Sequence, residues 1–308
     1  MSIAELTTGA VVIAAFVVAP LMVGAIQRQK AYLQGRVGVS ALQPYRELRR
    51  LWHKHVVQPT GSTIVYTLAP AACAAALAAA LLTVPPGGAA PEFGLGHDAL
   101  VVVGLLALAR AVVALSAWDT TSGFGLMSAG RDLTFAVAGE ALLLLVLTTA
   151  ALPAGSTDLR AMWRGASGPE TWGHPAHWCG LVGMLLIVLL ETGRQPVDNP
   201  DTHLELTMVH EGPLLEYAGR DLAYLQWAGA ARHWVVLVLA AGLFLPHPAG
   251  AIGGLAVVLA WVAVLTGVLA LLETLVAKMR LLRVPALGGG TVALALVGII
   301  TWLAGVTL

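Results

Sequence analysis

One stretch of the chain, residues 191–221, holds most of the side chains that could do acid–base chemistry. It reads ETGRQPVDNPDTHLELTMVHEGPLLEYAGRD and lies between two long apolar runs. Ionisable residues between membrane helices are costly, and they usually face a bundle interior or a water-filled cavity and mark ion pathways. These residues therefore suggest proton uptake, release and transfer. The candidate carboxylates are Glu191, Asp198, Asp201, Glu205, Glu211, Glu216 and Asp221.

Two further charged residues lie inside apolar runs elsewhere in the chain. Arg110 stands well within such a run, and a lone arginine in a membrane needs a partner or water. Glu140 stands about two turns into the next run. A buried glutamate prefers its neutral form, so we expect Glu140 to take up and release a proton; a purely structural hydrogen bond is the alternative. The expected charge partners of the carboxylates are Arg110, Arg131, Arg194 and Arg220.

The acidic stretch is predicted to be broken rather than one continuous helix. Pro196 and Pro200 interrupt helical hydrogen bonding, and the segment from Thr202 to Glu205 fits a capping box for a short helix that ends near Glu211. Pro213 suits the first turn of the next helix. We expect a broken, partly embedded hairpin lined by carboxylates, because such backbone is tolerated at membrane depth only where protein or water covers it.

An ordinary acidic cytoplasmic loop is the alternative interpretation of this stretch. Apolar residues between the charges weigh against it, since a solvated loop does not need them; they are Leu204, Leu206, Met208, Val209, Leu214 and Leu215. Farther along, Glu216 and Arg220 have the i, i+4 spacing of a helical ion pair.

The elements that must hold these residues are membrane helices. The 308 residues are 58% hydrophobic and only 11% charged, whereas a soluble domain carries about 25% charged residues. The apolar segments are long and do not alternate, which favours helices over a β-barrel. We expect one all-α integral membrane domain, residues 1–308, with about eight transmembrane helices and the broken acidic hairpin between the fifth and the sixth. The predicted spans are Ile3–Ile26, Ile64–Val84, Ala99–Trp118, Leu133–Leu152, Trp178–Leu190, Leu214–Leu245, Ala251–Val276 and Gly288–Val306.

Lysine and arginine in the loops predict the orientation of these spans, because strongly basic loops stay cytoplasmic. The loops assigned to one face carry nearly all of them, and the opposite face has Arg160 and Arg164. We therefore expect a multi-pass protein of the inner (plasma) membrane with both termini outside. The formal net charge is zero, which implies no nucleic-acid partner. The acidic Glu5 before the first apolar run favours a retained span over a signal peptide.

The first basic loop is expected to contain a short amphipathic helix from Gln43 to His53, lying at the membrane surface. Its apolar residues recur at helical spacing, and basic residues fill the other positions. Two interpretations stay open, a topology signal bound to lipid headgroups and a docking platform for a soluble partner. The candidate docking residues are Arg36, Gln43, Pro44, Tyr45, Arg49 and Arg50.

Three other connections carry weaker signals. The glycine-rich segment 119–132 is expected to follow an irregular path. The segment 153–177 is expected to be a polar loop whose tryptophans anchor the neighbouring helices at headgroup level, with His177 in contact with solvent or headgroups. Glu273, near the end of the seventh span, is expected to have a surface role in which it pairs with Lys278 or the helix end.

The stretch ETGRQPVDNPDTHLELTMVHEGPLLEYAGRDLAYLQWA resembles the membrane anchor subunit of energy-converting [NiFe]-hydrogenases, of the kinds called formate hydrogenlyase subunit 4 and hydrogenase-4 component C. That family is similar in turn to a membrane subunit of respiratory NADH-quinone oxidoreductase. Three more stretches agree, so the resemblance covers nearly the whole chain: GRVGVSALQPYRELRRLW, ALARAVVALSAWDTTSGFGLMSAGRDLTFAVAGE and ALLETLVAKMRLLRVP.

The resemblance implies an ion-coupling anchor that joins a hydrophilic redox arm to antiporter-like membrane subunits within the lipid bilayer. Such a subunit is non-catalytic and holds no cofactor or metal; the [NiFe] centre and iron–sulfur clusters are expected in the hydrogenase large and small partner subunits. The carboxylates named above would begin a charged path, with Arg194 on the family's basic position beside Glu191. The segment PVDNPDTHLEL differs from the PFD-type segment of quinone reductases, which favours the hydrogenase branch.

Three alternatives stay open beside this hypothesis. The chain could be the quinone-site subunit of a complex like respiratory NADH-quinone oxidoreductase. It could be a stand-alone proton or sodium transporter, although the sequence shows no strong internal repeat of the kind many transporters have. It could also be a passive anchor whose charges are structural.

Overall fold

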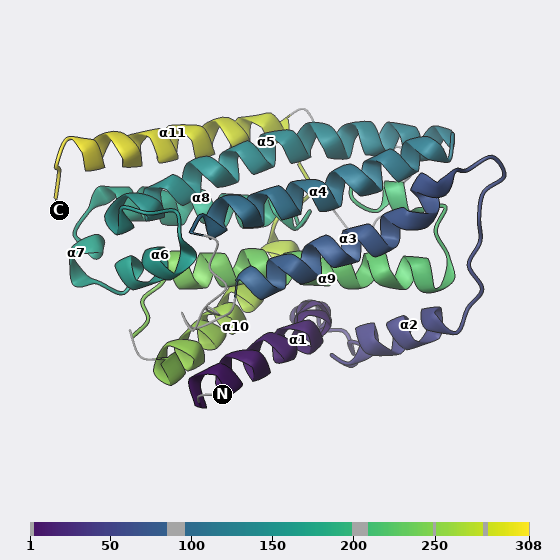
Figure 1. The fold of residues 1–308 in the computed structure, drawn as a ribbon, viewed down its shortest axis with the longest axis horizontal. Coiled ribbons are helices and arrows are strands. Elements are labelled where there is room, and N and C mark those ends of the chain that lie inside the picture. The colour runs from purple at the N-terminus through teal and green to yellow at the C-terminus, as the bar shows by residue number, and fades with distance from the viewer. Residues whose placement is uncertain (1–2, 85–95, 199–208, 249–250, 280–282, 308) are drawn as a thin grey trace.

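The computed structural model describes residues 3–84, 96–198, 209–248, 251–279 and 283–307, and every regular element in these ranges is helical (Figure 1). The all-α fold predicted from the sequence is therefore confirmed. The elements are α1 Ile3–Leu33, α2 Gln43–Trp52, α3 Ile64–Thr83, α4 Asp98–Asp119, α5 Gly123–Ala154, α6 Leu159–Ala166, α7 Pro169–Trp172, α8 Pro175–Glu191, the 3-10 turn η1 Gly212–Leu214, α9 Gly219–Phe244, α10 Ala251–Leu275 and α11 Val284–Leu303.

Each of the eight predicted spans coincides with a helix. Within the described ranges, six helices are long and apolar enough to cross a membrane, namely α3, α4, α5, α9, α10 and α11. The remaining two spans correspond to α1 and to the shorter apolar helix α8, whose 17 residues match the short fifth span expected from the sequence. The chain is thus built as a multi-pass membrane protein.

Helix α9 runs through the middle of the bundle (Figure 1). Almost every side chain from Ala228 to Phe244 is buried, as expected for a helix that is hydrophobic on all sides. It packs against α1, α2, α3, α8 and α10. Helices α1 and α10 lie side by side and cross the other helices obliquely, which brings the ends of α1 and α10 close to the loop that follows α8.

The connection between α4 and α5 corrects the expectation of an irregular segment over 119–132. Helix α5 begins at Gly123, well before the predicted start of the fourth span, and the turn is confined to residues 120–122. Thr121 takes a positive φ of 54° in this tight turn. The early start matters for the site, because it places Arg131 and Asp132 on a regular helix rather than on a loop.

The polar segment 153–177 is also more ordered than predicted. It contains α6 and α7, and the Asp158 side chain caps α6 by accepting a hydrogen bond from the Arg160 amide at 3.0 Å. Trp163 is buried against Gly242 of α9 instead of lying at headgroup level. His177 is buried as well, 3.2 Å from the Phe244 carbonyl oxygen. These side chains fill the end of the core, so the prediction that they contact solvent or headgroups was wrong.

The sixth span begins later than the predicted Leu214. Pro213 lies in η1, and Ala218 is extended, so α9 starts at Gly219. Glu216 therefore precedes the helix that contains Arg220, and the helical i, i+4 relation proposed between these two residues does not exist. The capping box at residues 202–205 lies outside the described residues, but the predicted break is present on both sides of them, at 192–198 and 209–218.

Candidate functional site

Two arginines hold a fully buried carboxylate at the centre of the bundle. Glu191 is the last residue of α8 and its side chain is 0% exposed. Its Oε2 accepts hydrogen bonds from Arg110 Nη2 of α4 at 2.9 Å and from Arg232 Nη1 of α9 at 3.1 Å. Arg110 Nη2 also donates to the Glu191 carbonyl oxygen at 3.1 Å, and Arg232 Nη2 donates to the Leu106 carbonyl oxygen at 2.8 Å. Three helices are thereby joined through one charge cluster.

The composition of this cluster is unusual for a purely structural ion pair. A buried charge is tolerated when it is paired and hydrogen-bonded, and one arginine would suffice to neutralise Glu191. The second arginine leaves an excess positive charge among these three side chains. Arg110 Nη1 and Glu191 Oε1 are buried without a hydrogen-bond partner among the described residues. The cluster therefore favours the approach of another anionic group.

Glu140 of α5 supplies such a group. It stands near the middle of the helix, and its Oε1 is buried without a hydrogen-bond partner among the described residues. Arg110, Arg232 and Glu191 all lie within electrostatic range of its carboxyl group. The neighbouring Gly139 explains how α5 comes so near: a Cβ there would lie 2.9 Å from Glu191 Oε1 and 2.9 Å from Leu190 Cδ2. Glu140, which the sequence places within an apolar run, thus lies beside the Glu191 cluster.

A second buried carboxylate, Glu273 of α10, is bridged in the same way. Its Oε2 lies 2.9 Å from Lys30 Nζ of α1, and its Oε1 lies 2.9 Å from Arg194 Nη1 of the loop after α8. The Glu273 side chain is 0% exposed. The expectation of a surface role and a bond to Lys278 was therefore wrong, because the oblique crossing of α1 and α10 encloses this end of α10.

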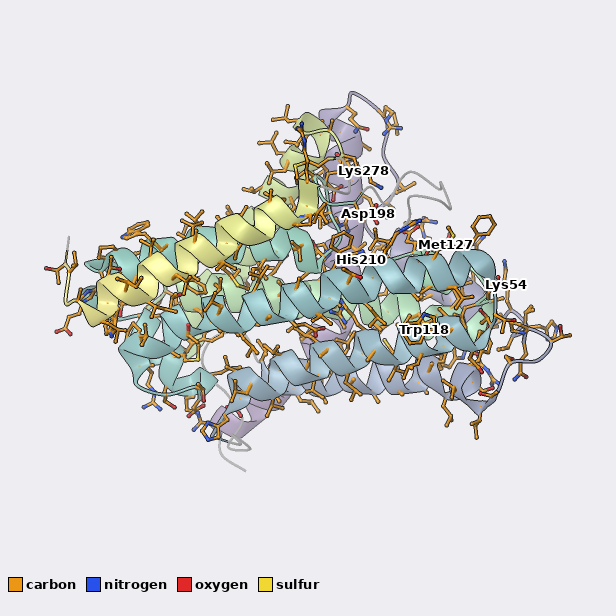
Figure 2. The ribbon with its side chains drawn as sticks, turned by 90° about the horizontal axis from the view of Figure 1, so that it is seen from above. Lys54, Trp118, Met127, Asp198, His210 and Lys278 are labelled. Atoms are coloured by element: carbon orange, nitrogen blue, oxygen red, sulfur yellow. The ribbon has the colours of Figure 1, made fainter. Side chains whose placement is uncertain are left out.

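Lys278 instead pairs with Asp198, at 2.7 Å between Nζ and Oδ1. Figure 2 shows Lys278, Asp198 and His210 next to one another. The His210 ring lies between two acids, with Nδ1 3.9 Å from Asp198 Oδ2 and Nε2 3.9 Å from Asp132 Oδ1 of α5. Burial lowers the pKa of His210 although both acids oppose this shift. An imidazole placed between two carboxylates can relay a proton from one to the other after a small movement.

The turn after α8 positions Arg194 and Asp198. Gly193 has a φ of +58°, and a Cβ there would lie 2.9 Å from the His210 ring, so glycine suits this position on both counts. The Asp198 Oδ2 accepts a hydrogen bond from the Val209 amide at 3.2 Å. This bond holds the backbone at Val209 against the turn that follows α8. The proline-broken backbone predicted from the sequence is what lets one short segment contribute to all three clusters.

A cavity of about 430 Å³ connects these charges with the surface beside α2. Its wall includes Gln43 and Glu47 of α2 at one side and Arg110, Glu191 and His210 at the other. Charged side chains line part of the cavity and apolar groups line the larger part, and its volume is sufficient to hold water. The cavity thus extends from the buried Glu191 toward α2.

The structure separates some of the predicted carboxylates from this cluster. Glu211 lines the cavity with the central charges. Glu216, Arg220 and Asp221 lie instead around the start of α9, where both acids act on Tyr66 of α3. Arg131 forms no ion pair with any described residue, and its Nη1 is buried. Two predicted members, Asp201 and Glu205, lie outside the described residues.

The candidate docking residues divide between two environments. Arg36, Arg49 and Arg50 are exposed, and Arg50 pairs with Glu47. Gln43 and Pro44 line the cavity wall. Tyr45 donates a hydrogen bond to the Val17 carbonyl oxygen of α1, so it fixes α2 against the bundle. The amphipathic helix itself is confirmed, since α2 spans Gln43–Trp52.

Several residues of the site were not selected from the sequence, namely Lys30, Asp132, His210, Arg232, Glu273 and Lys278. Arg232 carried a usable signal, because it interrupts an apolar run as Arg110 does. Lys30 and Glu273 lie near helix ends and resemble ordinary interfacial charges in the sequence. Their pairing follows from the side-by-side packing of α1 and α10. Among the described residues, no group of three histidine, cysteine or acidic side chains is arranged to hold a metal ion.

Comparison with known proteins identifies the family. The family described as NADH dehydrogenase matches residues 6–303. The chain belongs to this family. Formate hydrogenlyase subunit 4 from Escherichia coli (strain K12) is 33% identical to it over 285 residues, covering 86% of this chain and 88% of the relative. Hydrogenase-4 component C from the same organism is 32% identical over 231 residues, covering 74% and 71%.

A solved structure agrees with the fold of this NADH dehydrogenase family member. A chain of the membrane-bound sulfane sulfur reductase, an archaeal respiratory membrane complex, superposes with a TM-score of 0.82 and covers 96% of this chain and 98% of its own length. The identity is 17%, so the likeness concerns the fold. The resemblance to the hydrogenase membrane subunits and to the NADH dehydrogenases, inferred from the sequence, is confirmed.

Proposed function

We propose that this protein is the ion-coupling membrane anchor subunit of a multi-subunit, membrane-bound [NiFe]-hydrogenase complex. It would join a hydrophilic redox arm to antiporter-like membrane subunits and would not catalyse redox chemistry itself. The nickel–iron centre and iron–sulfur clusters would reside in the large and small hydrogenase subunits. The names of its two relatives at 32–33% identity support the hydrogenase branch.

The observation that carries the proposal is the continuity of buried charge. The cavity reaches from α2 to Arg110 and Glu191, and the arginines lie within electrostatic range of Glu140 in the middle of a transmembrane helix. Charges placed so deep are expensive to maintain, and in membrane proteins they mark ion pathways. A passive anchor would need neither the second arginine on Glu191 nor a carboxyl group beside it.

The coupling follows from electrostatics at short range. Electron transfer in a redox subunit docked near α2 would change the charge at the cavity mouth. Water and polar side chains of the cavity would transmit that change to the Arg110–Glu191–Arg232 cluster. The excess positive charge of the cluster favours ionised Glu140. A negative charge that approaches the cluster offsets this effect and favours protonated Glu140, and a negative charge that moves away favours the ionised form again. The proton taken up or released would then pass to the neighbouring membrane subunits.

The proposed setting is the plasma membrane, with α2 on the cytoplasmic side and both termini outside. The end of α4 and the starts of α5 and α9 gather at the α2 end of the bundle, whereas both chain termini lie away from it (Figure 1). Most basic loops belong to the α2 end, as the positive-inside tendency requires of a cytoplasmic face.

Replacement of Glu140 by glutamine tests the coupling role. The complex that co-purifies with the tagged chain would be reconstituted in liposomes, and hydrogen evolution from reduced viologen would be recorded together with ion uptake. We expect Glu140→Gln to assemble and evolve hydrogen while ion uptake is lost. Glu170→Gln is the matched control, because Glu170 is exposed on α7 at the opposite end. Undiminished ion uptake in Glu140→Gln would refute the role of this residue.

A quinone-site subunit of a complex like NADH-quinone oxidoreductase is the second candidate. The cavity of about 430 Å³ beside α1, α2 and α9 and the family match favour it. Quinone reduction by an intact purified complex that lacks hydrogen evolution would support this candidate over the hydrogenase. Ion transport by the isolated subunit in liposomes would instead support a stand-alone transporter.

A further inference from the structure

A second concave surface lies between α2, α3 and α9 and has no part in the charge cluster. This groove has a volume of about 560 Å³ and is lined by Leu48, Trp52, Ala71, Ala74, Ala75, Ala78, Ala223, Tyr224 and Trp227. We call it the alanine groove. Its wall contains no charged residue, and its floor consists of the small side chains of α3.

The aromatic side chains give the alanine groove a fixed shape. Trp52 and Tyr224 meet edge to face with ring centroids 5.4 Å apart, and Trp52 remains 54% exposed. Trp227 is held from behind, because it stacks on Phe16 at 5.6 Å and donates a hydrogen bond to the Phe16 carbonyl oxygen at 3.2 Å. The walls are therefore set by contacts within the chain.

The direction of the alanine groove follows from its lining. Ala71 and Ala78 are separated by seven residues of α3, so this wall runs about 10 Å along a transmembrane helix. On α9, Ala223, Tyr224 and Trp227 share one helix face with Arg220, which lies one turn nearer the α2 end. The groove thus begins at a positive charge near the membrane surface and continues into the apolar interior.

Other cations lie at this end of the alanine groove. The carbonyl oxygens of Lys54 and His55 pack directly on Gly219, so this basic loop is next to the exposed Arg220. Arg49 is exposed on the same helix as the groove residues Leu48 and Trp52. The acidic neighbour Asp221 acts electrostatically on both Tyr66 of α3 and Arg220, so the basic loop and Arg49 supply the positive charge that Asp221 does not offset.

We infer that the alanine groove binds an anionic phospholipid, with one acyl chain along α3 and the phosphate beside Arg220. Two parts of the surface match two parts of the ligand. The uncharged wall at membrane depth fits an acyl chain, and the cations at its surface end fit a phosphate. A zwitterionic lipid has the same chains but gains less from the cations.

The test uses the purified whole complex after delipidation in mild detergent. Phosphatidylglycerol and phosphatidylcholine with identical chains are titrated back, and retained lipid is counted by native mass spectrometry. We expect phosphatidylglycerol to bind more tightly, and Ala75→Phe, which fills the groove, to abolish retention of both lipids. Ala72→Phe is the matched control, because Ala72 is exposed on α3 outside the groove lining.

A second variant tests the headgroup without filling the groove. We expect Arg220→Gln to weaken phosphatidylglycerol binding about tenfold, the effect of one lost charge-assisted hydrogen bond, while phosphatidylcholine binding is unchanged. Arg164→Gln at the opposite end of the bundle removes the same charge and should change neither. Equal binding of the two lipids, or retention unaffected by Ala75→Phe, would overturn the inference. So would loss of a partner subunit from Ala75→Phe with normal lipid retention, which would identify the groove as a subunit contact.

Discussion

The Glu191→Gln substitution tests the buried charge cluster most directly, because it removes one charge and almost no volume. In the native protein, Oε2 of the fully buried Glu191 accepts bonds from Arg110 at 2.9 Å and Arg232 at 3.1 Å. A glutamine amide oxygen can still accept both bonds, but it has no charge to balance two guanidinium groups. Both arginines stay buried, since each also donates to a backbone carbonyl.

The expected magnitude follows from the cost of leaving a buried charge without its partner. Removal of one member of a buried ion pair destabilises a protein by about 3–5 kcal/mol. The two arginines converge on the same oxygen, so their mutual repulsion adds to this cost once the carboxylate is gone. We therefore expect the free energy of unfolding to fall by at least about 3 kcal/mol.

The assay is the free energy of unfolding in bicelles, measured by steric trapping. Glu47→Gln is the control, because Glu47 pairs with Arg50 in an exposed i, i+3 bridge and should cost at most about 1 kcal/mol. Adding Arg110→Gln to Glu191→Gln should cost less than the sum of the single changes, since it removes one uncompensated charge. A cost for Glu191→Gln no larger than that of Glu47→Gln would refute the ionic interpretation of the cluster.

Three further predictions concern the same contacts. Gly139→Ala should destabilise by about 1–3 kcal/mol, because its Cβ would lie 2.9 Å from Glu191 Oε1; Gly130→Ala on the same helix meets no atom within 4 Å and should stabilise by up to about 1 kcal/mol. Glu273→Gln should cost about 3–5 kcal/mol and increase hydrogen exchange at the paired ends of α1 and α10; unchanged exchange there would count against the bridge. Burial lowers the pKa of His210 in the folded protein, so this imidazole becomes protonated at a higher pH in the unfolded chain than in the folded one. The free energy of unfolding should therefore drop as the pH falls below about 6.5. His210→Gln should reduce that drop, and an equally steep pH dependence in the variant would contradict the assignment.

The membrane helices were predictable from the sequence because their cause is local. About 20 consecutive apolar residues are needed to cross a bilayer, and segments such as Ile64–Thr83 meet that need without reference to the rest of the chain. The amphipathic helix α2 and the break after Glu191 were predictable for the same reason, since side-chain periodicity and proline act within a few residues.

The exact helix ends were less predictable. The glycines near the start of α5 suggested an irregular segment, yet packing of α5 against α4 holds them in a helix. The early start of α5 places Asp132 beside His210. This contact cannot be predicted from the glycine content of the segment.

The pairing of charges was decided by the tertiary structure alone. Glu191 meets Arg110 across 81 positions and Arg232 across 41, and Glu273 meets Lys30 across 243. Composition and spacing determined that this chain is a helical membrane protein with carboxylates and arginines at membrane depth. Which acid faces which base depends on how each helix is rotated and how α1 and α10 cross the bundle. Those angles are set by the packing of whole helix faces, so no short stretch of sequence records them.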